Sequence, residues 1–340
     1  MVPIGIGEID VASRGFEGSP SGATSSEASS PAIPAISDRE SPPGSVLPIA
    51  LALAAIVILV IAIRRQWWRL RDEVGPTVRL RGDLSLIAFA AMILAGGIGA
   101  GLAVRGEDGS LARIAWTMGG LAAGQLLAAA PFLWLLREAA HHPRDASLGV
   151  AILPEDRTAS STGRSLLLGL GAMAFAYPVI ATLGQIASLV ETAIRGELPD
   201  PVAHDTLRAL VEGGGFATAA GLAISLLVVT AIPCCEEIAY RGLLQPAIGR
   251  GIGWFVQRGS GTPAGSAGSR WLAIGLTSIA FSLMHLSALP EASRGAALVT
   301  LAAVSILLGW LYERSGRLWA PIAAHGLFNA INLAIALLPA

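Results

Sequence analysis

Long apolar runs constrain this chain more than any other feature. A helix needs roughly 20 apolar residues to cross the hydrocarbon core of a bilayer, and about eight such runs follow one another after residue 44. Hydrophobic residues make up 53% of the 340 residues and charged residues only 14%, a combination that is rare in soluble domains. Because open sheet edges cannot face lipid, we predict an all-α, polytopic transmembrane bundle of about eight spanning helices. The runs are residues 45–63, 84–104, 114–136, 165–190, 214–235, 271–289, 295–312 and 318–338.

Composition divides the chain into three parts. Residues 1–44 are rich in Ser, Pro and Gly and have no sustained apolar periodicity, which predicts a disordered tail. Residues 45–190 hold the N-terminal transmembrane helices, and residues 191–340 hold the runs that carry ionisable side chains. Residues 201–215 mix apolar and charged positions at helical spacing, which fits a short interfacial helix or a soluble linker helix equally well.

Charge is sparse and is distributed unevenly between the loops. The formal net charge is -1 and the basic residues, all arginine, form no patch, which excludes a nucleic-acid partner. Arginines concentrate in residues 64–81 and 137–164, so these loops are predicted to be cytoplasmic. The same orientation places residues 241–270 and 314–317 in the cytoplasm and both termini on the other side of a cell (inner or plasma) membrane.

The sequence "EEIAYRG" places three ionisable residues at the end of an apolar run. Each such group costs on the order of 2.5 to 3.5 kcal/mol inside a span, so these groups usually face the bundle interior and carry function. Glu237 and Arg241 are four residues apart on one helix face, which predicts an ion pair. Glu236 points away from Arg241 and is therefore free to transfer protons, whereas Glu237 is a supporting carboxylate.

Two further clusters lie on later runs. "FSLMH" places Phe281 one turn before His285, and "HGLFN" places His325 one turn before Asn329. Taken alone, His285 and Asn329 are more typical of hydrogen-bonded packing residues. Two histidines, an asparagine and an unpaired carboxylate on separate helices are, together, what is needed to activate a water and stabilise an oxyanion.

The order and spacing of these clusters resemble a known family. "EEIAYRG", "FSLMH" and "HGLFN", with "GWLYERSGRLWAPIAAH" leading into the last, resemble the CPBP intramembrane proteases, also called the CAAX prenyl protease or Abi (bacteriocin-processing) family. The family motifs Glu-Glu-x-x-x-Arg, Phe-x-x-x-His and His-x-x-x-Asn/Asp are all met. The resemblance covers residues 214–338 and marks the segment 191–340 as a catalytic transmembrane core.

The resemblance implies an endopeptidase that hydrolyses a peptide bond without a covalent intermediate. By position, Glu236 and His285 would activate the water, and His325 and Asn329 would hold the developing oxyanion. Glu237 and Arg241 would support the site.

The resemblance leaves the metal content open. The family is often called a metalloprotease, and Glu236, His285 and His325 are the residues that would bind zinc if a metal takes part. An HExxH helix is absent, so a metal-free glutamic site fits equally well, and we favour it.

The expected substrate is a membrane-bound peptide or protein, cleaved at a site that faces the cytoplasm. Two readings of other classes remain open: a transporter that uses Glu and His as a proton relay, and a bacteriocin-immunity or scaffold protein that keeps the motifs for packing. The paired glutamates beside Arg241 favour an enzyme, because a relay would spread its groups across the bilayer.

Overall fold

The computed structural model describes residues 46–70, 82–107, 109–141, 159–196, 205–260 and 267–337. The predicted disordered tail, residues 1–44, lies outside these residues. Helices dominate the described segments, which contain no strand, and the predicted all-α class is confirmed.

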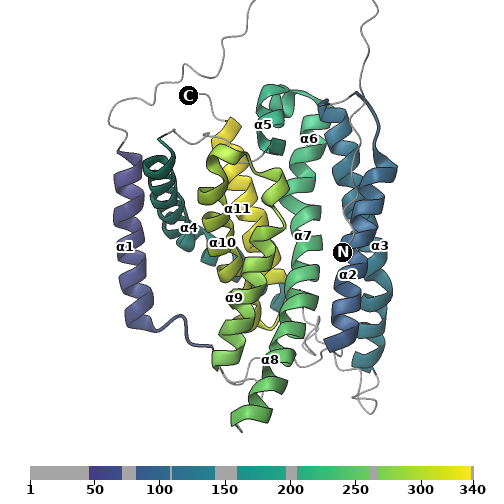
Figure 1. The fold of residues 1–340 in the computed structure, drawn as a ribbon, viewed down its shortest axis with the longest axis vertical. Helices are drawn as coiled ribbons and strands as arrows, with labels where there is room; N and C mark the ends of the chain where they lie inside the picture. The colour runs from purple at the N-terminus through teal and green to yellow at the C-terminus, as the bar shows by residue number, and fades with distance from the viewer. Residues whose placement is uncertain are drawn as a thin grey trace, which may run out of the picture. The chain divides into compact units, whose positions relative to one another are not determined.

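The helices follow the apolar runs in order (Figure 1). The first half contains α1 (Leu47–Arg65), α2 (Gly82–Ala103), α3 (Leu111–His141), α4 (Ala159–Arg195) and the short α5 (Asp205–Glu212). The second half contains α6 (Ala219–Leu226), α7 (Ile232–Glu237), α8 (Gln245–Ser260), α9 (Ala267–Leu283), α10 (Arg294–Ser315) and α11 (Trp319–Leu337). Two π-helical segments, Leu227–Ala231 and Ile238–Leu244, join α6, α7 and α8 into one continuous helical run.

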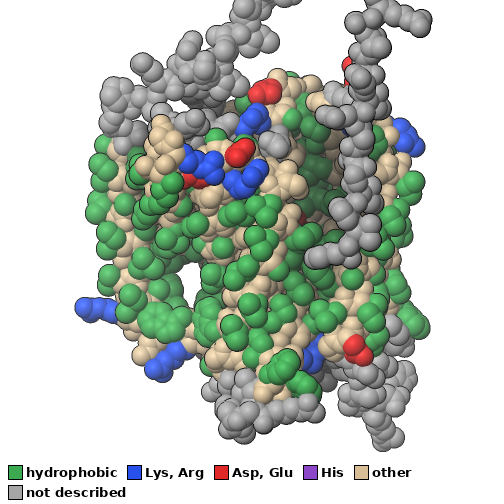
Figure 2. All heavy atoms as spheres, viewed as in Figure 1, with side chains coloured by type: hydrophobic (Ala, Val, Ile, Leu, Met, Phe, Trp, Pro, Cys, Tyr) green, Lys and Arg blue, Asp and Glu red, His purple; other side chains and the backbone are tan. Residues whose placement is uncertain are grey.

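Seven of these helical segments are long and apolar enough to cross a membrane. Each covers one predicted run, and α3 covers the remaining run, residues 114–136, without being among the seven. Hydrophobic side chains cover the middle of the face shown in Figure 2, and charged side chains lie towards its upper and lower ends. The chain is therefore a multi-pass membrane protein.

The fifth run differs from the prediction in length. We expected a span over residues 214–235 with the glutamates at its cytoplasmic end, but the helical segment extends over Ala219–Phe255. Glu236 and Arg241 consequently lie in its middle. Hydropathy alone places the end too early because Arg241 and Gln245 are turned into the protein interior, where they are 0% and 1% exposed.

The α7 segment is the centre of the bundle. It lies between the α2–α3 pair on one side and α9, α10 and α11 on the other (Figure 1). The largest buried cluster joins residues of α2, α3, α9 and α10 to the π-helical segment Ile238–Leu244. This packing fixes the helix that carries both glutamates against α2 and α3 on one side and α9 and α10 on the other.

Small residues bring α2 and α3 into close contact. A Cβ atom built on Gly120 of α3 would lie 2.3 Å from the carbonyl oxygen of Gly99 on α2. The neighbouring Gly119 faces open space, with no atom within 4 Å of such a Cβ. Close backbone approach of this kind is a common way for membrane helices to associate.

This contact predicts opposite effects of alanine at two adjacent positions. Gly120→Ala is expected to lower the free energy of unfolding by about 1–3 kcal/mol, because the added methyl forces the two backbones apart. Gly119→Ala is expected to leave stability unchanged or to raise it by up to about 1 kcal/mol through helix propensity. Thermal unfolding of both variants in the same detergent measures the difference, and equal midpoints would contradict the packing described here.

Candidate active site

Pro233 explains how the helix that carries the glutamates meets α11. Ile232 donates its N–H to the carbonyl of Leu227, and Pro233 has no N–H to donate, so the Val228 carbonyl lacks its usual main-chain partner. Asn329 of α11 satisfies it, with Nδ2 donating to that oxygen at 2.8 Å. The π-helical segment thus provides a docking point for the helix that carries His325.

The predicted ion pair between Glu237 and Arg241 is present. Glu237 Oε2 lies 3.2 Å from Arg241 Nε, and both side chains are 0% exposed. Arg241 Nη2 also donates to the hydroxyl of Ser305 on α10 at 2.8 Å and to its carbonyl at 3.2 Å. A buried charge is tolerated only when it is paired and hydrogen-bonded. The ion pair and the two bonds from Nη2 meet part of this requirement, whereas Arg241 Nε and Nη1 and Glu237 Oε2 make no hydrogen bond within the described residues.

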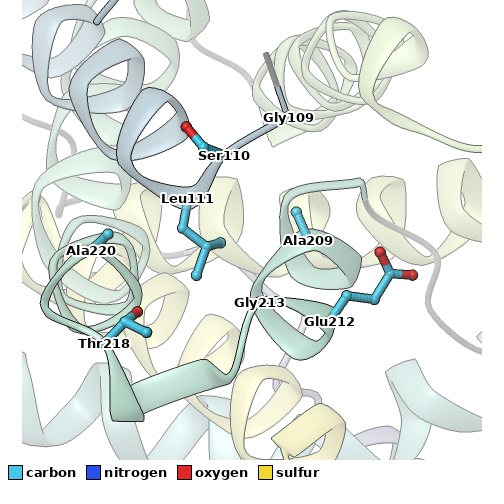
Figure 3. Close-up of a pocket in the computed structure, with 8 residues that line it drawn as sticks. All are labelled: Gly109, Ser110, Leu111, Ala209, Glu212, Gly213, Thr218 and Ala220. Atoms are coloured by element: carbon cyan, nitrogen blue, oxygen red, sulfur yellow. The ribbon is translucent and has the colours of Figure 1, made fainter. Parts of the chain in front are cut away.

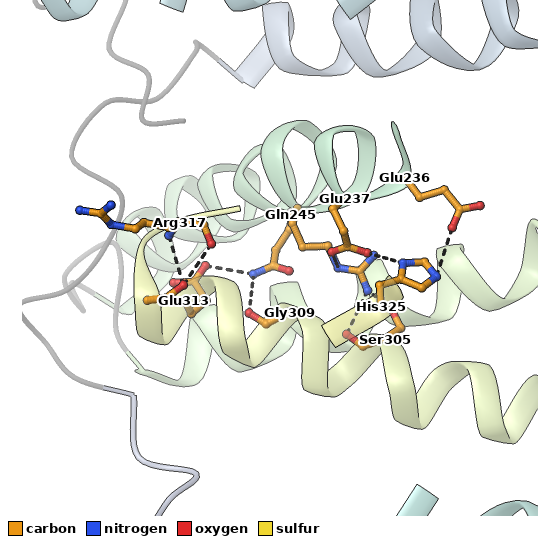
Figure 4. A network of polar contacts seen from close by, with 10 residues as sticks. Glu236, Glu237, Gln245, Ser305, Gly309, Glu313, Arg317 and His325 are labelled. Carbon is orange, nitrogen blue, oxygen red and sulfur yellow. Dashed lines mark hydrogen bonds and ion pairs between the residues drawn. The ribbon is translucent and has the colours of Figure 1, made fainter. Parts of the chain in front are cut away.

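Glu237 also orients the imidazole of His325. Glu237 Oε1 lies 2.9 Å from His325 Nδ1, and because a carboxylate accepts, Nδ1 is the donor. In the neutral ring the lone pair is then on Nε2, which faces Glu236 Oε2 at 3.6 Å. Figure 4 shows the ring between the two glutamates, with Glu237 on one nitrogen and Glu236 on the other.

His285 is oriented in the same way by its own helix. Its Nδ1 lies 2.8 Å from the carbonyl oxygen of Phe281, which can only accept, so Nδ1 is protonated and Nε2 faces Glu236 Oε1 at 3.8 Å. The ring of Phe281 packs 4.7 Å from the His285 ring and 5.8 Å from the His325 ring, measured between centroids. Phe281, which the sequence motif includes, therefore holds both imidazoles.

Glu236 and the two Nε2 atoms form a group of facing acceptors. The separations of 3.6 and 3.8 Å exceed the usual 2.7–3.2 Å of a hydrogen bond. At such separations a water molecule that donates to both sides is the natural bridge. Glu236 and His285 are about one-fifth exposed, at 19% and 20%, so water has access to them.

The structure brings together five of the six residues singled out by the sequence. Asn329 lies one turn from His325 on the same helix, and its described contact is with the Val228 carbonyl rather than with Glu236. The residues that sequence reasoning missed are Ser305, Gln245 and Glu313, which extend the network away from the site. Their spacing was the available signal, because Gln245 follows Arg241 by four residues and Glu313 follows Ser305 by eight.

The metal set considered from the sequence is Glu236, His285 and His325. Within the described segments, no group of three or more His, Cys, Asp or Glu side chains meets the geometry of a metal site. The metal-free site stays a prediction.

A separate cavity of about 530 Å³ lies at the α5 end of the bundle (Figure 3). Its walls come from the α2–α3 connection, α5 and the start of α6, and Glu212 is the only ionisable residue among them. None of the motif residues lines it. The cavity is therefore distinct from the cluster around Glu236.

The carboxylate of Glu237 is shared between Arg241 and His325, so the stability of the ion pair can be tested by substitution. Arg241→Met leaves Glu237 as an unpaired buried charge and is expected to cost about 3–5 kcal/mol. Adding Glu237→Gln removes that charge and keeps an acceptor for His325 Nδ1, so the double variant should recover most of the lost stability. Thermal unfolding of the single and double variants measures this recovery, and additive losses would show that the two side chains are independent.

Comparison with known proteins gives a family match for the segment that carries this site. Residues 218–331 match the family of type II CAAX prenyl endopeptidases described as Rce1-like. No curated protein and no solved structure matches the chain. The matched segment starts before α6, ends within α11 and includes both glutamates, both histidines and Asn329. Residues 218–331 of this chain are therefore a domain of the Rce1-like CAAX protease family, the family predicted from the motifs.

Proposed function

We propose that this protein is an intramembrane endopeptidase that hydrolyses a peptide bond with a water held between Glu236 and two histidines. The observation that supports this most is the position of Glu236, whose two oxygens face one imidazole Nε2 each at 3.8 and 3.6 Å. The family match supports an endopeptidase in general. The roles of individual residues are our inference from the contacts.

In the proposed reaction, Glu236 accepts a proton from the bound water while His285 Nε2 accepts a hydrogen bond from its second hydrogen. The resulting hydroxide attacks the carbonyl carbon of the scissile bond. Glu236 then returns the proton to the nitrogen of the leaving amine as the C–N bond breaks. Glu236 therefore carries one hydrogen of the water to the amine, and the second stays on the new carboxyl group. Because the water attacks the carbonyl directly, no covalent intermediate forms.

His325 and Asn329 are proposed to stabilise the oxyanion that forms during attack. His325 can donate through Nε2 only when both ring nitrogens carry a proton, and its Nδ1 is held by Glu237 Oε1 at 2.9 Å. Asn329 uses one amide hydrogen on the Val228 carbonyl and has a second for the oxyanion. Arg241 pairs with Glu237 and holds it in place.

We propose that the site opens to the cytoplasmic side of a cell membrane. His325 lies less than two turns from the start of α11 at Trp319. The contact between Gln245 and Glu313 lies further towards the same end of the bundle, where α10 meets α11 at Arg314 and Arg317. Arginines in that turn are the sequence signal for a cytoplasmic loop.

The proposed substrate is a peptide or protein that is itself associated with the membrane. An active site between spanning helices is reached most readily by a chain that lies in or beside the bilayer. The family description names CAAX prenyl endopeptidases, and we do not restrict this chain to prenylated substrates.

Glu236→Gln tests the proposal directly. The variant keeps the shape of the side chain but cannot take a proton, so peptide cleavage should fall by about 10²–10⁴-fold, the usual contribution of a general base. Comparing membrane peptidomes of cells with wild-type or variant protein should show the loss of a specific fragment. Glu191→Gln is the matched control, because Glu191 is also a buried carboxylate but binds the N-terminal end of α10.

Two results would overturn the proposal, one from the peptidome comparison and one from a flux measurement. An unchanged peptidome with Glu236→Gln would exclude the protease. Coupled ion or solute flux in liposomes that depends on Glu236, without proteolysis, would instead support a transporter that uses the same residues as a proton relay.

Metal content is tested separately. We expect purified wild-type protein to hold no stoichiometric zinc and to keep its activity after dialysis against a chelator. Stoichiometric zinc that disappears in His285→Ala would contradict the metal-free mechanism and point to Glu236, His285 and His325 as ligands.

A further inference from the structure

Two buried polar stripes face each other below the hydrolytic site. One runs along the helix that carries the glutamates and the other along α10, and each repeats every four residues, which places its members on one helix face. Polar groups in a membrane interior must find partners within the protein. The first stripe is Glu237, Arg241 and Gln245. The second is Ser305 and Glu313, with the main-chain carbonyl of Gly309 between them (Figure 4).

The stripes are joined at two levels. The upper level is the contact of Arg241 with Ser305. One turn further, Gln245 Nε2 donates to Glu313 Oε1 at 3.1 Å and to the carbonyl of Gly309 at 3.4 Å. A Cβ atom at position 309 would lie 2.8 Å from Gln245 Oε1, the end of a flexible side chain, so a larger residue there would displace the Gln245 amide from its present contacts.

Glu313 joins three of the helices that build the site. It lies on α10, accepts from Gln245 of α8, and binds Arg270 of α9 with 2.8 Å between Oε2 and Arg270 Nε. Arg270 also donates from Nη2 to the Glu313 carbonyl at 3.2 Å. His285 directly follows α9 and Glu236 belongs to the α7–α8 run, so Glu313 joins the two helical segments that lead to these residues.

Burial makes these contacts hard to replace. Gln245 is 1% exposed and Glu313 is 5% exposed, so water does not substitute for either partner. Hydrogen bonds inside a low-dielectric interior are strong when satisfied and costly when broken. The register between the helices is therefore set by a few specific atoms rather than by apolar packing alone.

We infer that Gln245 and Glu313 are positioning residues of the hydrolytic site, which act through the register of α8, α9 and α10. The inference rests on the proposed function, because it concerns the geometry of Glu236 and His285 during hydrolysis. Neither residue touches the reacting atoms. Displacement of a reacting group by about 1 Å is enough to lower a rate by about 10²-fold.

Two conservative variants test the inference, each with a matched control. Gln245→Met keeps the length of the side chain and removes its donor, and Gln125→Met makes the same change at a buried glutamine that packs against Gly96 of α2. Glu313→Gln removes the negative charge that faces Arg270 at the C-terminal end of α10. Its control, Glu191→Gln, removes a negative charge that pairs with Arg195 and binds the N-terminal end of α10. All four changes are close to isosteric.

The kinetic readout uses proteoliposomes and a quenched fluorogenic peptide with a farnesylated CAAX end, or the peptide that spans the peptidome fragment if the wild type does not cut the first. We expect Gln245→Met and Glu313→Gln to lower kcat by about tenfold or more while KM stays within about twofold, because the substrate contacts are intact and the reacting groups are misplaced. Both controls should keep wild-type kcat and KM.

A second readout does not depend on a substrate. Diethyl pyrocarbonate modifies unprotonated imidazoles, and mass spectrometry gives the rates at His285 and His325 separately. Both rates should rise in Gln245→Met and Glu313→Gln relative to their controls, because the rings lose their fixed orientation.

The outcomes separate this inference from the proposed function. Wild-type kcat and unchanged modification rates in Gln245→Met and Glu313→Gln would overturn the inference, as would a loss of activity equal to that of the controls. If Glu236→Gln still cleaves the peptide, the proposed function fails, whatever the positioning variants do.

Discussion

The buried carboxylate of Glu237 is the interaction on which the rest of the site depends. One oxygen pairs with Arg241 and the other lies on His325 Nδ1, so a single side chain joins the central helix to α11 and, through the arginine, to α10. This sharing fixes which nitrogen of His325 is protonated and turns its Nε2 towards Glu236. Without Glu237, the histidine has no reason to keep that orientation, and Arg241 becomes an unpaired charge in the interior.

The helix that carries the glutamates is adapted to this arrangement by local irregularity. π-helical segments lie immediately before Ile232 and after Glu237, and such segments often occur at functional sites. Pro233 releases a carbonyl that Asn329 then binds. An irregular backbone that would be costly against lipid is thereby used to join two helices inside the bundle.

The sequence predicted the broad fold and the main contacts well, for identifiable reasons. Apolar runs of spanning length depend only on hydropathy, and the Glu237–Arg241 pair depends only on four-residue spacing, which survives the change to π-helical geometry. The end of the fifth run was misplaced because Arg241 and Gln245 have the composition of an interface but lie in the interior. Hydropathy does not say which way a polar side chain points.

Other features depend on contacts between distant segments and were not visible in the sequence. The bond from Asn329 to Val228 follows from the hydrogen-bond register beside Pro233, which no periodicity reveals. The contact of Gln245 with Glu313 is made beside Gly309, where a Cβ atom would displace the glutamine amide. Its only sequence trace is the matching four-residue repeat on two helices, which becomes meaningful once the helices are known to be neighbours.

In the proposed mechanism, three late helices direct Glu236, His285 and His325 at one reaction site. Electron cryo-microscopy of the protein in lipid nanodiscs, at a resolution that shows ordered water, tests this arrangement. We expect Glu236 to lie between both imidazoles, with one ordered water within hydrogen-bond distance of the Glu236 carboxylate and of His285 Nε2. A Glu236 carboxylate that faces acyl chains, or that lies far from both imidazoles, would contradict it.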